Sequence, residues 1–144
     1  LEADNKPDSI TLMVQKEVAE RICAKPGKMS LLAVSVQCYA EAKIITKVPS
    51  SYFWPEPKVD SAVIKLSVFD SSHLVAPDEN FFKIVKAGFS SKRKLLLNNL
   101  MGLLGKSQKI EILKILKQVG INDKARAQDL SVQQWHDLTR ELKV

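Results

Sequence analysis

Two segments in the first half of the chain, residues 42–48 and 62–69, alternate apolar and polar residues with the two-residue period of a half-buried β-strand. The connection between them is about a dozen residues long and has no helical pattern, which does not suit a parallel crossover. The pattern therefore predicts an antiparallel pair of strands. A nearly continuous apolar run at 9–14 predicts a third strand, one that lies inside a sheet and is covered on both faces.

Helical spacing of apolar residues follows the first of these three strands. Residues 15–24 and 30–40 each place apolar side chains at three- and four-residue steps, and Lys25-Pro26-Gly27 ends the first helix. The first half is thus predicted to be the carboxy-terminal part of an α/β sheet with three strands and two helices. Three strands, one of them wholly apolar, leave an unprotected edge and face, which indicates that the chain is part of something larger.

The pattern becomes wholly helical after a polar segment at 71–77 that is typical of a linker. Asp78 or Asn80 can cap a first helix. The apolar stripe of that helix is expected to consist of Phe82, Val85 and Phe89. Gly88 followed by Ser90-Ser91 predicts a break, because glycine weakens a helix and serine offers a fresh cap for the next one.

Three more helices are predicted in the second half. One continues over residues 95–104 and ends at a glycine, and Ser107 can cap the next, which Gly120 closes in the C-cap position. Ser131 with Gln134 forms a capping box for a last helix that runs to residue 143.

The loop between the two alternating strands is rich in aromatic residues and proline: Tyr52-Phe53-Trp54-Pro55-Glu56-Pro57-Lys58. Each proline fixes its own φ and favours extended geometry in the residue before it, so the loop is stiff. Phe53 and Trp54 can therefore present a ring outward at low entropic cost, beside the charge of Lys58. This combination suits a flat ligand that carries an anion, such as a nucleotide. The alternative is that both aromatic side chains plug the end of the sheet.

The net charge of +6 comes entirely from the second half of the chain. Residues 1–77 contain nine Lys or Arg and nine Asp or Glu, whereas residues 78–144 contain thirteen and seven. A segregated basic excess is typical of a protein that contacts a polyanion or an anionic surface, although a basic helical face is often only solvated.

The basic cluster Lys92-Arg93-Lys94 directly follows Ser90-Ser91. A helix that starts there carries three cations at the positive end of its dipole, each of which costs up to about 1 kcal/mol. A phosphate at that helix start would be bound by free N–H groups, the dipole and the cations together. Alternatively, the two lysines are solvated and Arg93 pairs with an acid elsewhere. Arg126, on the turn before the last helix, is a weaker candidate for the same surface.

Other residue types argue against several kinds of site. The five glycines form neither a dinucleotide fingerprint nor a P-loop. Cys23 and Cys38 have apolar neighbours and indicate buried thiols in a reducing compartment, while His73 and His136 stand alone, so a zinc site has little support. No apolar run approaches the length of a membrane span and the amino terminus is acidic and polar. We therefore expect no membrane segment, no signal peptide and a cytoplasmic protein.

Four stretches together resemble the carboxy-terminal part of the KsgA (RsmA) family of rRNA adenine dimethyltransferases, relatives of the Erm methyltransferases. They are Leu12 to Arg21, Phe53-Trp54-Pro55-Glu56-Pro57-Lys58-Val59-Asp60-Ser61-Ala62-Val63, Phe89 to Lys94 with Asn98 and Leu100, and Arg126-Ala127 before Leu130-Ser131. The second stretch is highly specific, because the pattern F-x-P-x-P-K-V-[DN]-S is hard to meet by chance. The resemblance implies part of a Rossmann-like class I methyltransferase sheet in residues 1–70, a linker at 71–77 and a helical RNA-binding domain in residues 78–144.

The resemblance also implies a reaction and a partner. Two methyl groups would pass from S-adenosylmethionine to the exocyclic amines of adenosines near the 3′ end of small-subunit rRNA, in the ribosomal subunit. In such enzymes the target base is turned out of its stack and held between aromatic rings, and Phe53 stands at the family position for one ring. Trp54 matches no known functional position, which leaves packing as an interpretation. The positions that would face rRNA are Lys16, Lys58, Lys92, Arg93, Lys94 and Arg126.

Two departures from the family limit what the resemblance implies. The family's cofactor half, with its G-x-G-x-G loop, acidic ribose ligand and N-[IL]-P-[YF] motif, has no counterpart, because the chain is expected to begin just after that motif. We therefore expect these residues alone to bind no S-adenosylmethionine and to be inactive. Met29-Ser30 replaces the common Tyr-Gly before the second helix. A competing hypothesis is a non-catalytic RNA-binding module that serves as a ribosome-assembly factor.

Overall fold

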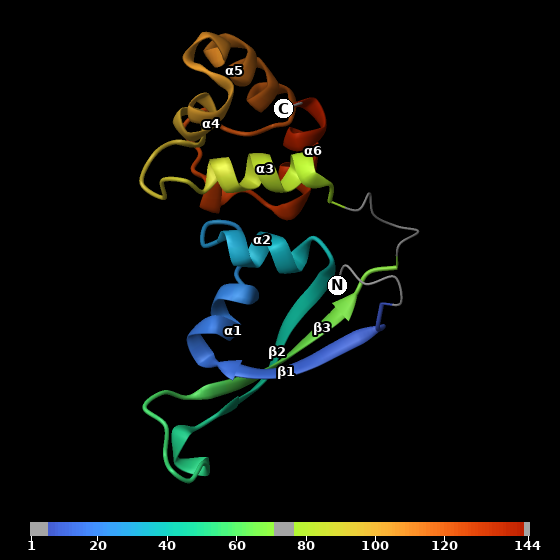
Figure 1. The fold of residues 1–144 in the computed structure, drawn as a ribbon, viewed down its shortest axis with the longest axis vertical. Coiled ribbons are helices and arrows are strands. Elements are labelled where there is room, and N and C mark those ends of the chain that lie inside the picture. The colour runs from blue at the N-terminus through green and yellow to red at the C-terminus, as the bar shows by residue number, and fades with distance from the viewer. Residues whose placement is uncertain (1–5, 71–76, 143–144) are drawn as a thin grey trace. The chain divides into compact units, whose positions relative to one another are not determined.

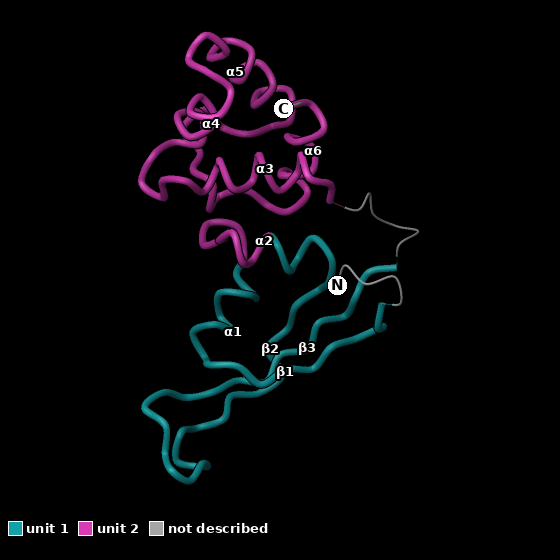
Figure 2. Tube along the Cα trace, in the orientation of Figure 1, with its two compact units in different colours: residues 1–24, 35–76 teal, residues 25–34, 77–144 magenta. Residues whose placement is uncertain are grey.

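The protein, described here by a computed structural model over residues 6–70 and 77–142, divides into two compact units (Figures 1 and 2). The sheet unit comprises residues 1–24 and 35–76, and the helical unit comprises residues 25–34 and 77–144. The predicted fold class, part of an α/β sheet followed by an all-α region, is confirmed. Of the predicted linker at 71–77, all but Pro77 lies outside the described residues.

Within the described residues the chain forms three β-strands and six α-helices. In order they are β1 (Ser9–Gln15), α1 (Lys16–Ile22), α2 (Leu31–Gln37), β2 (Ala40–Val48), β3 (Ser61–Val68), α3 (Glu79–Gly88), α4 (Leu96–Leu104), α5 (Lys109–Gln118) and α6 (Val132–Glu141). Short 3-10 turns lie at Ser50–Tyr52, Lys106–Gln108 and Ala127–Asp129. Each predicted helix and strand is thus present, with ends that differ by a few residues.

The three strands form one antiparallel sheet in the order β1-β3-β2. The antiparallel pairing of β2 with β3, predicted from the length of their connection, is confirmed. Leu12, Ile64 and Ile44 lie opposite one another across the sheet, and α1 packs against all three strands. The face that α1 covers includes three buried residues of β3, Ala62, Ile64 and Leu66.

A β-bulge in β2 breaks the alternation that the sequence predicts. Ile44 pairs with Ile64 but Thr46 pairs with Val63, so Ile45 is the extra residue. Beyond the bulge the faces exchange, and Lys47 lies opposite the buried Ala62. The regular alternation predicted for residues 42–48 is therefore wrong beyond Ile44, because one extra residue moves every later side chain to the opposite face.

Strand β1 is exposed in this chain, contrary to the prediction of an interior strand covered on both faces. Among the described residues it pairs only with β3 and stands at an edge of the sheet. Leu12 is 43% and Met13 55% exposed, although both belong to the apolar run. An apolar run indicates that a strand is suited to burial. Burial also requires other segments that cover the strand, and the described residues do not provide them.

Several helix caps predicted from the sequence can be compared with the helix ends in the helical unit. Asp78 accepts a hydrogen bond from the backbone N–H of Phe81, and Ser131 forms the predicted capping box with Gln134. Gly120 has φ +71° and follows α5 as predicted. The predicted cap at Ser107 is wrong, because a 3-10 turn precedes α5 and its N-cap residue is Gln108.

The buried stripe of α3 is shifted by one residue from the predicted one. Its buried residues are Phe81, Ile84, Val85 and Gly88. The predicted stripe residues Phe82 and Phe89 are only half-buried. Gly88 also does more than weaken the helix, because a Cβ atom there would overlap the ring of Trp135, which is fully buried on α6. The glycine lets α3 approach the tryptophan closely.

His136 makes the stability of the helical unit depend on pH. Its ring stacks on Phe81 with 4.6 Å between ring centroids, and its Nε2 atom is buried with no hydrogen-bond partner among the described residues. Burial lowers the pKa of His136 below 6.5, an effect that Arg140 reinforces and that Asp137 and Asp78 oppose. The neutral ring is therefore the form that the fold favours.

We expect the helical unit to lose stability as the pH falls below about 6.5, because the unfolded chain then binds a proton that the folded one resists. The loss grows until the pH reaches the lower pKa of the folded state. Urea unfolding midpoints measured between pH 7.5 and 5 should show this decline. His136→Phe keeps the stack on Phe81 and should flatten the decline, whereas an unchanged pH profile in that variant would contradict the assignment.

Candidate nucleic-acid interface

The aromatic loop between β2 and β3 projects beyond the end of the sheet (Figure 1). Hydrogen bonds across its base hold it: the Ser50 N–H donates to Asp60 Oδ1 over 3.1 Å, and the Ser50 hydroxyl donates to Glu56 Oε1 over 2.9 Å. The Phe53 N–H donates to the Ser50 carbonyl over 3.1 Å. The peptide bond between Trp54 and Pro55 is cis. The loop is therefore ordered by contacts of its own.

The three consecutive aromatic residues of the loop differ in exposure. Phe53 is half-buried, while Tyr52 is 78% and Trp54 97% exposed. The interpretation that Trp54 packs is wrong for the described part of the chain, since almost none of its ring is covered. The side chain of Lys58 is also exposed. A nearby element joins the loop, because the Lys16 N–H at the start of α1 donates to the Asp60 carbonyl over 3.0 Å.

The basic cluster Lys92-Arg93-Lys94 lies in a turn and not in the first turn of a helix. Helix α4 begins at Leu96, with Leu95 as its N-cap residue. The Leu96 N–H already donates to the Ala125 carbonyl over 2.9 Å. The prediction of three cations at the positive end of a helix dipole is therefore wrong, and so is the argument for a phosphate on that helix start.

All three side chains of this basic turn are exposed, and none forms an ion pair with another residue of the described chain. The alternative in which Arg93 pairs with an acid thus finds no partner there. The turn itself is closed by the Lys94 N–H, which donates to the Ser91 carbonyl over 3.1 Å. The three side chains thus lie on an ordered turn and are exposed to solvent.

Asn99, which was not among the residues predicted from the sequence, holds this turn through hydrogen bonds of its side chain. Its side chain is 5% exposed, and Nδ2 donates to the carbonyls of Gly88 over 2.6 Å and Ser91 over 3.0 Å. Both hydrogens of the amide are thereby used, one at the end of α3 and one at the start of the basic turn. The sequence signal was present but local rules missed it: an asparagine inside an apolar helical stretch.

The structure brings Arg126 to the same part of the helical unit as the basic turn. The hydrogen bond between Leu96 and Ala125 joins the residues that follow Lys94 to the residue that precedes Arg126. The Arg126 N–H donates to Asp129 Oδ2 over 2.8 Å, and its side chain is exposed. The helical unit therefore holds Lys92, Arg93, Lys94 and Arg126, whereas Phe53, Lys16 and Lys58 belong to the sheet unit.

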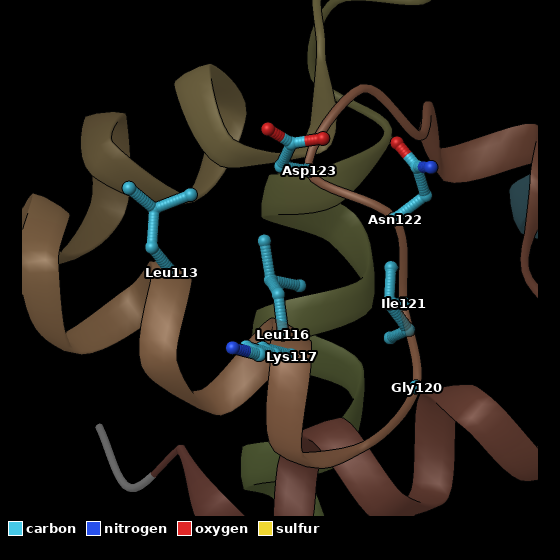
Figure 3. A pocket seen from close by; sticks show the side chains of 7 residues that line it. All are labelled: Leu113, Leu116, Lys117, Gly120, Ile121, Asn122 and Asp123. Atoms are coloured by element: carbon cyan, nitrogen blue, oxygen red, sulfur yellow. The ribbon is translucent and has the colours of Figure 1, made fainter.

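A hollow of about 530 Å³ lies on the helical unit and contains none of these residues. It is formed by the end of α5 and the segment after it, with Leu116 between Leu113 and Ile121 in the view of Figure 3. The remaining lining residues are Lys117, Gly120, Asn122 and Asp123. Its lining is partly apolar and partly polar and has no set of converging polar groups. The aromatic loop and the basic turn are therefore better candidate sites than this hollow.

Among the described residues, no three His, Cys, Asp or Glu side chains come together in a way that could hold a metal ion. Likewise, none of the helices in this part is long and apolar enough to cross a membrane. Cys38 is buried and Cys23 half-buried, and burial raises the pKa of the Cys23 thiol, so it stays protonated more readily than a free cysteine.

The architecture is that of the carboxy-terminal part of an RNA methyltransferase. A crystal structure of a dimethyladenosine transferase from Plasmodium falciparum matches 95% of this chain and 58% of its own length, with a TM-score of 0.74 and 28% identity. The 23S rRNA methyltransferase ErmE shares the fold over 94% of this chain and 55% of its own, with a TM-score of 0.69 and 24% identity.

The chain belongs to the ribosomal RNA adenine dimethylase family, whose sequence model matches residues 1–143. The ribosomal RNA small subunit methyltransferase A of Dehalococcoides mccartyi strain CBDB1 is 43% identical over 98% of the chain and 48% of its own length. The protein of the same name from Nostoc punctiforme is 45% identical over 95% of the chain and 48% of its own length. The chain thus spans about half the length of these curated relatives.

Proposed function

We propose that this chain is the part of an rRNA adenine dimethyltransferase that positions RNA. The reaction transfers two methyl groups from S-adenosylmethionine to the N6 amine of adenosines near the 3′ end of small-subunit rRNA. The observation that carries the proposal is the family match over residues 1–143, together with similarity over nearly the whole chain to proteins named ribosomal RNA small subunit methyltransferase A. We also propose that the ribosomal subunit is the partner and the cytoplasm the place of action.

The described residues do not fit S-adenosylmethionine. The junction of β1 with α1 passes directly from Gln15 to Lys16 without a glycine, and α1 has only seven residues. The glycines with positive φ are Gly27, Gly105 and Gly120, and none of them follows a strand. A nucleotide cofactor needs a backbone cradle of the kind that glycine permits after a strand. We therefore propose that the cofactor is bound outside these residues.

The proposed role of Phe53 is to stack on the adenine that has been turned out of the RNA. The ring is half-buried, and the hydrogen bonds at Ser50 hold the loop that carries it. An ordered ring of this kind fixes the plane of the base, so that the amine is presented in one orientation. Lys58, exposed on the same loop, is placed to attract the phosphates beside that base.

Phe53→Ala in the full-length protein should lower the methylation rate by about 100-fold, because the base loses its fixed orientation. The affinity for rRNA should fall much less, since the phosphate contacts remain. Phe53→Tyr keeps the ring and serves as the control. Single-turnover methylation and RNA binding are measured on the same variants. Equal losses of rate and affinity in Phe53→Ala would instead favour a module that only binds RNA.

A further inference from the structure

The tip of the aromatic loop leaves two large rings in solvent that the proposed function has not used. Trp54 is 97% and Tyr52 78% exposed. Aromatic rings are among the largest contributors to burial in folded proteins and interfaces, so neighbouring exposed rings on one loop mark an interaction surface. The rings of Tyr52 and Trp54 are called the loop platform below.

The loop platform is distinct from the position of Phe53. The two side chains differ in exposure, because Phe53 is half-buried whereas Trp54 is 97% exposed. Trp54 therefore offers nearly its whole ring to a ligand, whereas only part of the Phe53 ring is accessible.

The charges around the platform indicate what covers it. Both carboxylates of the loop, Glu56 and Asp60, accept hydrogen bonds from Ser50. Lys47 and Lys58, in contrast, are exposed and form no ion pair within the described chain. Aromatic rings with free cations beside them fit a single nucleic-acid strand, whose bases stack and whose phosphates are anionic. A protein partner fits less well, because lysine is depleted from protein interfaces.

We propose that Trp54, with Tyr52 beside it, stacks on an unpaired base that neighbours the one held by Phe53, and so provides a second stacking position for the RNA strand. The proposal deepens the proposed function and rests on it, since it requires that this loop contacts RNA. Because the hydrogen bonds of Ser50 order the loop before RNA arrives, little conformational entropy is lost on stacking.

The test uses the full-length protein and small-subunit rRNA transcript that has not been methylated. Trp54→Ala should weaken RNA binding roughly 5- to 100-fold, the range expected for one stacked base. It should raise KM for RNA with a small change in kcat, whereas Phe53→Ala lowers kcat. Trp54→Phe should restore most of the affinity. Ile110→Ala, which removes an 81% exposed side chain from α5, is the control and should bind as the unmodified protein does.

Each other outcome overturns the proposal. If Trp54→Ala binds RNA normally while Phe53→Ala is impaired, the second stacking position is wrong and the proposed function stands. If Trp54→Ala lowers the thermal unfolding midpoint of the full-length protein with RNA affinity unchanged, the ring packs against another part of that protein. If the unmodified protein does not bind the transcript, the proposed function fails together with the inference.

Discussion

Asn99→Asp should destabilise the helical unit by about 3 kcal/mol or more, a large share of the stability of a typical domain. The two side chains have almost the same shape, but an ionised carboxylate has no hydrogen to donate. It would face the carbonyls of Gly88 and Ser91, which now accept from the amide over 2.6 and 3.0 Å. A buried charge would thus meet two partial negative charges, and both carbonyls would lose their donor. Urea unfolding followed by circular dichroism measures the change.

The neighbouring residue supplies a matched control for this substitution. Asn98 is exposed, so Asn98→Asp makes the same chemical change one position earlier in α4 and should alter stability by no more than about 0.5 kcal/mol. Asn99→Leu, which keeps the volume but removes the donors without adding charge, should fall between the two. A midpoint for Asn99→Asp equal to that of Asn98→Asp would show that the amide does not hold the basic turn.

The elements that the sequence predicts correctly are those whose causes are local. Asp78 and Ser131 cap their helices through residues three positions later, so both partners stand in one short stretch of sequence. The antiparallel pairing of β2 with β3 follows from the length of one connection. These features depend on neighbours along the chain, and a pattern of residue types records such neighbours.

The basic turn was misassigned because its causes are distant in the sequence. Ser90-Ser91 is a local signal for a helix start, although the three cations that follow are unfavourable at the positive end of a helix dipole. In the folded unit, Asn99 binds Ser91 from eight residues away and Ala125 takes the Leu96 N–H from almost thirty. Because of these two contacts, the helix begins only at Leu96, and the three cations lie in the turn before it. Tertiary hydrogen bonds overrode a cap that the sequence alone favours.

The bulge at Ile45 and the exposure of Trp54 could not be predicted from the sequence for a related reason. Either face of the segment 42–48 contains isoleucine, so its composition does not reveal where one extra residue enters the strand. Likewise, an aromatic residue next to prolines predicts a stiff loop but not whether another side chain covers the ring. The family motif identified Phe53 as a candidate, whereas only the structure showed that Phe53 is half-buried and Trp54 almost fully exposed.

The second large effect is expected when the charge of the basic turn is reversed. Replacing Lys92, Arg93 and Lys94 together by glutamate should weaken binding to small-subunit rRNA about 100-fold or more near physiological salt. The fold should survive, because these side chains are exposed and form no ion pair within the described chain. Filter binding over a range of salt concentrations measures the affinity, and circular dichroism checks the fold.

Salt dependence separates contact with phosphates from a general attraction between a basic protein and RNA. If the three cations each neutralise a phosphate, their replacement by glutamine should lower the slope of log K against log salt by about 2 to 3. Glutamate at Lys106, Lys109 and Lys114 reverses three exposed lysines of the same unit and changes the net charge equally. Since net charge alone would make the two triple variants equivalent, equal losses of affinity would refute a specific role for the basic turn. A markedly larger loss at Lys92, Arg93 and Lys94 would place the RNA backbone against the turn that Asn99 holds.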